Sequence, residues 1–431
     1  MPEVALDNSQ DKLQQDRIEN YDATVVDKDP YDVDIADFNM INPHLFSSNT
    51  LWPWFKRLRE EEPVHYCRDS VFGPYWSVTS YDAIMKVDTS HDIFSSEPNI
   101  TVGDLQEDFP LATFIAMDRP KHDEQRAVVN PAVRGQQLRD FEPLIRKRTQ
   151  RVLDSLPVGE EFNWVEKVSI ELTTCMLATL FDFPFEDRAK LTRWSDVTFA
   201  IPGLGVVDSE EQRREELLEC LAAFTELWNQ RVNEEPRGDF ISLLAHGSAT
   251  QEMDPFEYLG NILLLIIGGN DTTRNSMSGS VLCQNLYPEQ FDKLKAQPEL
   301  IPSMVSETIR WQTPLAYMRR TANQDTILGD KQIKKGDKVL MWYVSGNRDE
   351  SHFENPDDYI IDRPNVRSHL SFGFGIHRCM GNAVGEMQLR VLWEEILQRF
   401  DRIEVVGDVE RVPSSFVKGY SSLPVILHPK K

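Results

Sequence analysis

The sequence predicts a mainly α-helical protein with a smaller β region. Apolar residues recur at three- and four-residue spacing across residues 136–235, which is typical of packed amphipathic helices. Residues 254–287 form one helical pattern that is apolar on every face up to Ile267, which indicates a helix through the middle of the protein. After Thr313, short alternating stretches separated by Gly-Asp and Lys-Gly turns predict the β region.

The N-terminal part of the chain predicts an arm, a helix and a hairpin. Residues 1–40 are acidic, polar and aperiodic, so we expect an extended arm ahead of a single domain over residues 41–431. Residues 51–62 have an amphipathic pattern that Pro63 ends. Aromatic and β-branched residues across 64–78 flank a Gly-Pro turn, which predicts the hairpin.

The long helix has predictable ends. Asp254 can cap its N-terminus, Pro255 suits its first turn, and Pro288 ends the pattern. A helix of roughly 30 residues spans ~45 Å at 1.5 Å per residue.

The remaining elements follow from local pattern and from turn residues. An apolar loop, residues 201–207, interrupts the helical region, and a last helix runs from near Cys379 to Phe400. We expect short strands over residues 326–333, 338–343 and 402–428.

Charge and cysteine usage exclude several classes of protein. Lys and Arg total 46 against 70 Asp and Glu, and the net charge of -24 argues against nucleic acid as a partner. The five cysteines are scattered without a CxxC pair, which argues against a disulfide framework or a zinc tetrad and favours a reducing cytoplasm. The polar N-terminus and a longest apolar run of six residues, Ile262 to Ile267, predict no signal peptide and no membrane anchor.

Residues 372–381, FGFGIHRCMG, are the strongest candidate site. Their glycines allow positive φ and a close approach of the backbone to a flat ligand. Cys379 directly precedes a helical pattern, where free amides and the helix dipole stabilise a thiolate. Since His377 and Arg378 add donors or positive charge, the segment suits a sulfur ligand to iron. The competing interpretation is a buried structural cysteine after a glycine loop.

Residues 268–273, GGNDTT, are the second candidate site. Two glycines inside a helix cost ~1 kcal/mol each, and Asp271 follows a long apolar run that places it near the interior. Because neither feature favours stability, a functional site is plausible. The alternative is a kink in which Thr272 donates its hydroxyl to the carbonyl of Gly268.

Two charged pairs lie at helical spacing. Glu307 and Arg310 share one helix face, where a surface ion pair is the ordinary interpretation. His122 and Arg126 also share a face and can grip a carboxylate, although a solvated charged face is the ordinary interpretation of such a pair. A basic cluster, Arg146, Lys147, Arg148 and Arg151, is either a solvated helix face or a docking patch for an acidic electron donor.

The glycine–cysteine segment resembles the haem-binding signature FxxGxHxCxG of the cytochrome P-450 superfamily. Its signature positions are occupied by Phe372, Gly375, His377, Cys379 and Gly381. The resemblance implies a long central helix over a buried haem b, with the sulfur of Cys379 as the proximal ligand of the iron. It also implies that His377 binds a haem propionate and that Phe372 packs near the sulfur.

The other motifs acquire roles from the same resemblance. GGNDTT is similar to the superfamily's acid–alcohol pattern, in which Asp271 would relay protons and Thr272 would hold the hydrogen-bond network near dioxygen. Glu307 and Arg310 would form a buried structural element extended by Arg363. The remaining propionate ligands would be His122, Arg126 and Arg320, with Arg319 as the rival of Arg320.

The pocket of this family lies above the haem. The resemblance places in its wall, together with the loop of residues 99–114, the substrate-binding candidates Ile201, Leu204, Leu264, Ile267, Gly268, Leu315, Ala316 and Phe416. Nearly all of these residues are apolar, which predicts an aliphatic substrate.

Residues 262–279 and 369–382 also resemble a narrower group, the soluble bacterial CYP alkane hydroxylases. This resemblance implies O2-dependent hydroxylation of the terminal methyl of a medium-chain alkane, fatty acid or alcohol. It further implies electrons from NADH through a ferredoxin reductase and a ferredoxin. The alternatives are a terpenoid or polyketide hydroxylase of the same superfamily and a non-catalytic haem-binding protein.

Overall fold

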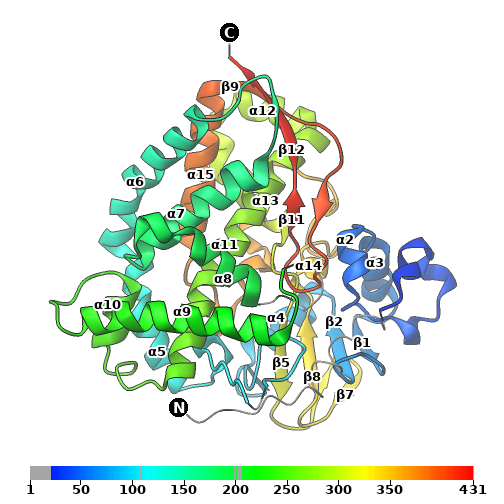
Figure 1. Cartoon of the computed structure of the whole chain (residues 1–431). Helices are drawn as coiled ribbons and strands as arrows, with labels where there is room; N and C mark the ends of the chain where they lie inside the picture. The colour runs from blue at the N-terminus through cyan, green and yellow to red at the C-terminus, as the bar shows by residue number, and fades with distance from the viewer. Residues whose placement is uncertain (1–20, 107, 199, 201–205, 431) are drawn as a thin grey trace.

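The computed structural model describes residues 21–430 except 107, 199 and 201–205. Its centre is helix α11, Pro255–Leu286, whose 32 residues run through the middle of the molecule (Figure 1). Residues before Ile267 are buried on nearly every side, as the apolar pattern predicts. The side chain of Asp254 caps the helix by accepting hydrogen bonds from the amides of Phe256 and Glu257, and Pro255 occupies the first turn.

Two layers of helices pack against α11. The layer that covers its first half buries the aromatic side chains Phe181, Trp194 and Phe224, and the layer that covers its second half buries Trp393. The helices concerned are α5 (Lys121–Val129), α6 (Gly135–Asp154), α7 (Glu171–Leu180), α8 (Ala189–Thr198), α9 (Glu210–Arg231), α10 (Phe240–His246), α12 (Pro288–Ala296), α13 (Ile301–Gln312) and α15 (Asn382–Arg399).

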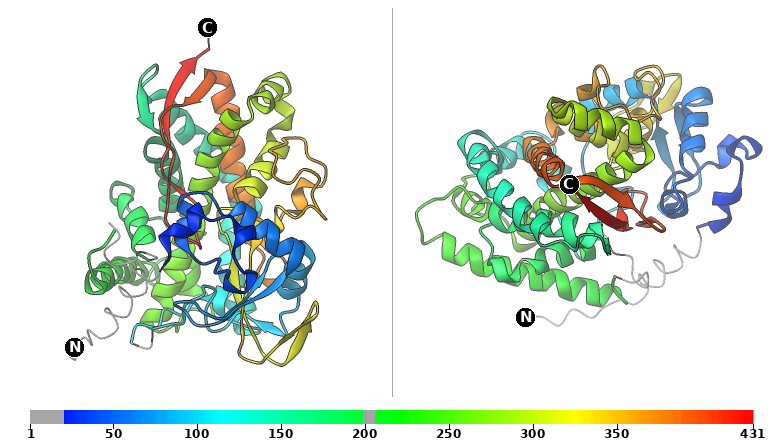
Figure 2. Two further views of the ribbon diagram at one scale, coloured as in Figure 1. Left: turned by 90° about the vertical axis from the view of Figure 1, so that its right-hand side faces the viewer. Right: turned by 90° about the horizontal axis from the view of Figure 1, so that it is seen from above.

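A five-stranded mixed sheet lies beside the helical body, as both views of Figure 2 show. Its strand order is β1-β2-β8-β5-β3, in which β2 and β8 pair in parallel and the other neighbours are antiparallel. The strands are β1 (Val64–Cys67), β2 (Tyr75–Val78), β3 (Phe94–Ser95), β5 (Met318–Ala322) and β8 (Lys338–Met341). The helices at this sheet are α2 (Pro43–Ser47), α3 (Trp52–Glu61), α4 (Tyr81–Thr89) and α14 (Tyr343–Gly346).

Three smaller sheets complete the β region. A three-stranded antiparallel sheet has the order β4-β12-β9 and joins the C-terminal strands to the segment after α6. The strands of the small sheets are β4 (Glu161–Asn163), β6 (Thr326–Leu328), β7 (Lys331–Ile333), β9 (Phe400–Val405), β10 (Glu410–Arg411), β11 (Tyr420–Ser422) and β12 (Pro424–Pro429). The mainly helical fold with a smaller β region is confirmed.

The expectation of an extended arm is wrong for the described residues 21–40. They form three short 3-10 helices, Ala23–Asp27, Pro30–Asp32 and Ile35–Asp37, and each is capped by the side chain of the aspartate before it. The aspartates that made this segment look like a solvated arm therefore cap its short helices. Phe38 and Met40 are buried against α2 and α3, so the arm joins the core before residue 41.

In the part that the structure describes, the predicted helical region of residues 136–235 also includes a strand and a π-helical segment. Strand β4 follows a turn at Gly159, and a π-helical segment, Val165–Ile170, leads into α7. Pairing of β4 with the distant C-terminal strand β12 explains the strand, since local periodicity carries no information on such a partner. Within the described residues, we find no helix that is both long and apolar enough to cross a membrane.

Candidate active site

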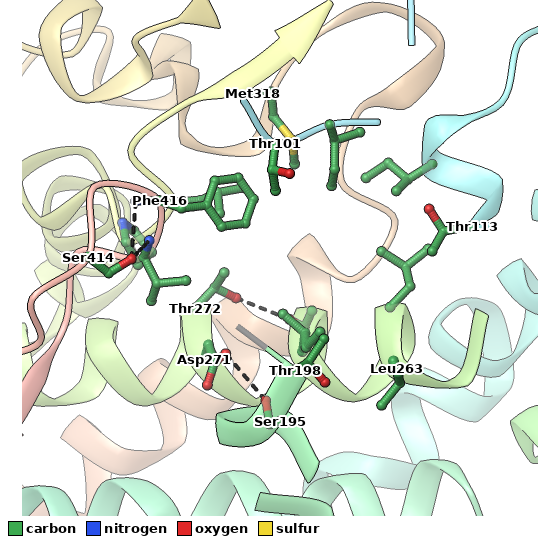
Figure 3. A pocket seen from close by; sticks show the side chains of 18 of the residues that line it. Thr101, Thr113, Ser195, Thr198, Leu263, Asp271, Thr272, Met318, Ser414 and Phe416 are labelled. Atoms are coloured by element: carbon green, nitrogen blue, oxygen red, sulfur yellow. Dashed lines mark hydrogen bonds between the residues drawn. The ribbon is translucent and has the colours of Figure 1, made fainter. Parts of the chain in front are cut away.

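A cavity of about 1300 Å³ lies beside the middle of α11. Its other walls are the loop of residues 99–114, the segment before β5, the turn around Phe416 and the glycine–cysteine segment. Figure 3 shows Thr272 of α11 on the side of Phe416 and Met318, whereas Asp271 points the other way, toward Ser195. The volume exceeds the roughly 300–1,000 Å³ of an ordinary ligand pocket, which leaves room for a cofactor as well as a substrate.

The glycine–cysteine segment presents Cys379 to this cavity. The amide of Cys379 donates to the carbonyl of Phe372 at 2.8 Å, which folds the segment into a tight loop ahead of α15. Gly375 has a φ of +67°, and a Cβ atom there would lie 2.6 Å from the carbonyl oxygen of Asp88, so only glycine fits. Cys379 is the exposed member of the five free cysteines, and that exposure faces the cavity.

The surroundings of the Cys379 thiol act on the charge of its sulfur in opposite directions. Burial raises its pKa, and the backbone N–H of Gly381 together with the positive charges of Arg126 and Arg378 oppose the rise. A metal cation on the sulfur would complete this stabilisation. Within the described residues, no three His, Cys, Asp or Glu side chains gather as a metal site, so the other ligands of such a metal would come from a cofactor.

His377, which lines the cavity, and His122, which packs against it, each have an unused ring nitrogen. The rings of His122 and His377 lie 4.1 Å apart between centroids, and both are buried. His122 Nδ1 bonds to Asp123 and His377 Nε2 to Ser96, but His122 Nε2 and His377 Nδ1 have no hydrogen-bond partner in the described part of the chain. Burial lowers the pKa of both residues, that of His377 to about 2. A buried polar atom without a partner is costly, which indicates a ligand at this point.

The arginines follow the alternation of strand β5. Arg320 lines the cavity and donates to Asp88 Oδ1 at 3.0 Å, whereas the side chain of Arg319 bonds to Asp104 Oδ1 at 2.8 Å. Since neighbouring strand residues point to opposite faces, Arg320 rather than its rival faces the candidate cofactor site. Arg126 also lines the cavity and donates to the carbonyl of Arg378.

The two glycines of α11 serve different contacts. A Cβ atom on Gly268 would meet no atom within 4 Å and would project into the cavity, while one on Gly269 would lie 2.7 Å from Leu177 Cδ2 on α7. Thr272 donates its hydroxyl to the carbonyl of Gly268 at 3.1 Å, as the structural interpretation of this motif expects. The same threonine lines the cavity, so both interpretations describe part of its position.

Asp271 belongs to a buried network between α11 and α8. Its Oδ1 accepts from Arg274 Nη2 at 2.6 Å, and its Oδ2 accepts from Ser195 Oγ at 3.3 Å (Figure 3 draws the latter). Arg274 also donates to Asp196 Oδ1 at 3.1 Å, and the side chain of Asp196 is 36% exposed. Burial raises the pKa of Asp271, because its desolvation outweighs the charge of Arg274. The network links a buried acid to the surface.

Glu307, Arg310 and Arg363 form a buried network away from the cavity. Arg310 donates to both oxygens of Glu307 at 2.7 and 2.8 Å, and Arg363 Nε lies 3.1 Å from each of them. The side chains of Glu307 and Arg310 are 0% exposed, so the surface ion pair is excluded. The remaining donors of the two arginines bind backbone carbonyls of residues 347–358, which fixes the segment that leads to the cysteine loop.

Most of the predicted wall residues line the cavity, with one correction. The structure places in the wall Leu264, Ile267, Gly268, Leu315 and Phe416, whereas Ile201 and Leu204 lie outside the described residues. The prediction for Ala316 is wrong. Its side chain is 0% exposed and packs in the core between α2 and the sheet, because its backbone pairs with Phe416 and Val344 and turns the side chain inward. Tyr317 and Met318 line the cavity instead.

Sequence reasoning missed several residues around the site. Asp88 accepts from Arg320, from the Tyr343 hydroxyl and from the amide of Phe374, and Ser96 holds His377. Both come from segments 232 to 286 residues before their partners, so no local pattern reveals them. Arg274 carried a detectable signal, since it stands three residues after Asp271 on one helix face.

The basic cluster on α6 is only partly solvated. Arg146 bonds to three glutamates, and Arg148 donates to the carbonyl of Cys175 and to Thr179 Oγ1. Lys147 and Arg151 are the exposed members. The cluster is therefore neither a uniformly solvated face nor a continuous patch of four free charges.

The inner end of the cavity fits a haem. A thiol sulfur faces the space from one side, Gly268 leaves room on α11, and cationic or unpartnered groups that suit two propionates gather at the edge. Those groups are Arg126, Arg320, His122 and His377. The donor set matches a flat, dianionic cofactor that brings its own metal.

Comparisons with known proteins agree with this site. A model of the family "Cytochrome P450" matches residues 296–417. The chain is 34% identical over 401 residues to linalool 8-monooxygenase of Pseudomonas putida, covering 90% of this chain and 98% of that protein. It is 30% identical over 388 residues to the methyl-branched lipid omega-hydroxylase of Mycobacterium bovis, covering 86% of this chain and 90% of that protein.

A solved structure is similar over nearly the whole chain. CYP153D17 from Sphingomonas sp. PAMC 26605 superposes with a TM-score of 0.86 at 48% identity, covering 91% of this chain and all of that one. Sequence and structure thus agree over the segments that carry the cysteine loop, the long helix and the buried ion network. The chain belongs to the cytochrome P450 family.

Proposed function

We propose that this cytochrome P450 monooxygenase hydroxylates the terminal methyl of a medium-chain alkane, fatty acid or alcohol. It would use O2 and electrons passed from NADH through a ferredoxin reductase and a ferredoxin in the cytoplasm. The observation that carries the proposal is the apolar wall beside Thr272, built from Leu264, Ile267, Leu315 and Phe416. The similarity to a methyl-branched lipid omega-hydroxylase supports reaction at a chain end.

Membership of the family implies haem, which we take to be haem b. Cys379 would hold its iron, and His122, Arg126, Arg320 and His377 would hold its propionates. When bound, a haem with a thiolate ligand supplies the activation of O2, because the sulfur pushes electron density onto the iron and favours O–O cleavage. The glycine loop around Gly375 would let the backbone lie flat against the cofactor.

Asp271 and Thr272 would supply protons beside this centre. The raised pKa of Asp271 lets its carboxyl hold a proton at higher pH than an ordinary aspartate does. Its bridge through Arg274 to Asp196 connects it to the surface, from which the proton would be replaced. The Thr272 hydroxyl lies on the cavity side of the same turn, where it can donate a hydrogen bond to a ligand.

The apolar wall would orient the substrate and exclude water. A terminal methyl has stronger C–H bonds than the methylenes behind it, so selectivity for the terminus requires the chain to enter end-on. Leu264 and Ile267 on α11 and Phe416 opposite them would confine the chain in this way. No ionisable side chain stands among these wall residues, which suits an aliphatic chain.

A product analysis tests the proposal. The purified holoenzyme with a ferredoxin, its reductase and NADH is incubated separately with octane, dodecanoic acid and a monoterpene. We expect hydroxylation at the terminal carbon of the linear chains. A strongly red-shifted Soret band of the reduced protein with carbon monoxide, lost in Cys379→Ala, shows that the thiolate holds the iron. A protein with this band that forms no product is a haem carrier rather than an enzyme.

A second candidate is hydroxylation of a terpenoid, which the 34% identity to linalool 8-monooxygenase favours. The same incubation separates the two candidates. Turnover of the monoterpene with no terminal product from octane or dodecanoic acid selects the terpenoid.

A further inference from the structure

A cluster of charged side chains lines the cavity where α9 begins. Glu210, Arg213 and Arg214 on the first turns of α9 line the cavity, and Asp108 on the loop of residues 99–114 holds Arg214 from outside. These four residues, the outer cluster, include the partly exposed Asp108, so the cluster lies where the cavity approaches the surface. A substrate whose methyl points to the haem would place its other end here.

Both arginines of the outer cluster are already engaged. Arg214 binds Asp108 with two hydrogen bonds, Nη1 to Oδ2 at 2.7 Å and Nη2 to Oδ1 at 3.1 Å. Arg213 Nη1 donates to Glu210 Oε1 at 2.7 Å, and its Nη2 donates to the carbonyl of Thr198 at 2.9 Å. A planar guanidinium that binds one carboxylate through two parallel hydrogen bonds cannot bind a second carboxylate with the same two donors.

The acids of the cluster also oppose a negative ligand. Two arginines stand against two carboxylates, so the cluster supplies no net positive charge. Glu210 is buried, and its Oε2 has no hydrogen-bond partner within the described part of the chain. A fatty-acid carboxylate at this end would have to shed its water beside that oxygen and displace Asp108 from Arg214, which brings no net gain in ion pairing.

We propose that the outer cluster selects substrates whose far end is uncharged, and that Asp108 is a specificity-determining residue because it occupies Arg214. Among the substrates of the proposed function, on which this inference rests, alkanes and primary alcohols are thereby favoured over fatty acids. An alkane end or a neutral hydroxyl leaves the Arg214–Asp108 pair intact.

The side chain of Asp108 is 52% exposed, which makes it a mild position to change. Asp108→Asn removes one negative charge and weakens the fork on Arg214, so a substrate carboxylate can take the place of Asp108. The affinity of this variant for a fatty acid should rise by the contribution of one partly exposed ion pair, about threefold to fivefold. This gain should shrink at high salt, since the pair lies near the surface.

The test compares 1-dodecanol with dodecanoate on the haem-loaded enzyme. Dissociation constants come from the shift in the spin state of the iron and, independently, from titration calorimetry. We expect the wild type to bind 1-dodecanol more tightly, and Asp108→Asn to tighten dodecanoate about threefold to fivefold with no change for the alcohol. Adding Arg214→Gln to that variant should abolish the gain.

Glu216→Gln is the matched control. Glu216 also lies on α9 and binds an arginine at two points, Arg193 at 2.6 Å each, but it does not line the cavity. We expect it to leave both dissociation constants unchanged. A wild type that binds dodecanoate as tightly as the alcohol, or an Asp108→Asn effect equal for both ligands, overturns this inference alone. Failure of both ligands to bind overturns the proposed function together with it.

Discussion

Two buried carboxylates of this protein share a sequence pattern and differ in their surroundings. Glu307 and Asp271 each stand three residues before an arginine on the same helix, and each binds that arginine at 2.6–2.8 Å. Around Glu307, a second arginine and the amide of Ile360 satisfy both oxygens, and backbone carbonyls occupy Arg310. Around Asp271, the arginine is shared with a partly exposed aspartate, and the carboxyl borders the cavity.

The difference separates an ion pair that stabilises the backbone from one that suits the proposed transfer of protons. The carboxylate of Glu307, whose two oxygens are bound by two arginines and an amide, fixes the backbone around it. Burial raises the pKa of Asp271, because its one shared arginine does not offset the loss of hydration, so this carboxyl can be neutralised. Spacing alone does not distinguish the two; the partners contributed by distant segments do.

The largest effect we expect is on the stability of the Glu307 network. Glu307→Gln leaves two buried arginines without their countercharge and should cost about 3–5 kcal/mol of unfolding free energy. The matched change Asp271→Asn should cost less than about 1 kcal/mol, because Arg274 keeps Asp196 and a neutral side chain suits that site. Urea unfolding of the three proteins measures both values, and equal losses would remove the distinction.

The reverse order should hold for turnover. Asp271→Asn cannot release a proton, so we expect the rate of product formation to fall about 100-fold, within the usual range for a lost acid or base. The fold and the carbon monoxide spectrum should be retained. Single-turnover rates in H2O and D2O measure the effect, and an unchanged rate would place Asp271 with the structural carboxylates.

Thr272→Ala tests the cavity side of the same motif, with a smaller expected loss. The variant keeps the haem but removes the hydroxyl that faces the cavity, so most of the electrons from NADH should appear as hydrogen peroxide. The ratio of product to NADH consumed measures this diversion. Tightly coupled turnover in Thr272→Ala would contradict the role given to its hydroxyl.

The smallest effect concerns the dependence of stability on pH. Burial raises the pKa of Asp271 above its unfolded value, so its contribution to stability is complete below that unfolded value, near pH 4, and is lost as the pH rises through the folded value. Asp271→Asn should therefore gain stability relative to the wild type as the pH rises above about 4. Thermal unfolding across pH 4–8 measures the difference, and a flat difference would show that Asp271 titrates normally.

Much of the fold could be predicted from short-range pattern. The ends of α11 followed from Asp254 and Pro288, and the β region from its turn residues, because caps and turns act within a few residues. The orientation of Ala316 could not be predicted, since pairing with the turn at Phe416 decides it. The acidic N-terminal residues misled because an aspartate in a solvated arm and one that caps a 3-10 turn look alike in sequence.

The candidate site divides in the same way. Cys379, His377 and Thr272 lie in compact motifs that can be recognised in the sequence. The residues that hold the cysteine loop in place come from distant parts of the chain. Asp88 and Ser96 approach the cysteine loop only through the packing of α4 and β3 against it. The outer cluster joins residues 106 positions apart, which no spacing rule connects.

The paired glycines of α11 have a practical consequence for reshaping this enzyme. A methyl group at Gly268 would occupy empty volume, whereas one at Gly269 would displace the Leu177 side chain of α7. Adjacent positions thus control independent quantities, the free volume of the cavity and the packing of α11 against α7. Redesign for shorter substrates can begin at the first glycine while the second keeps the architecture unchanged.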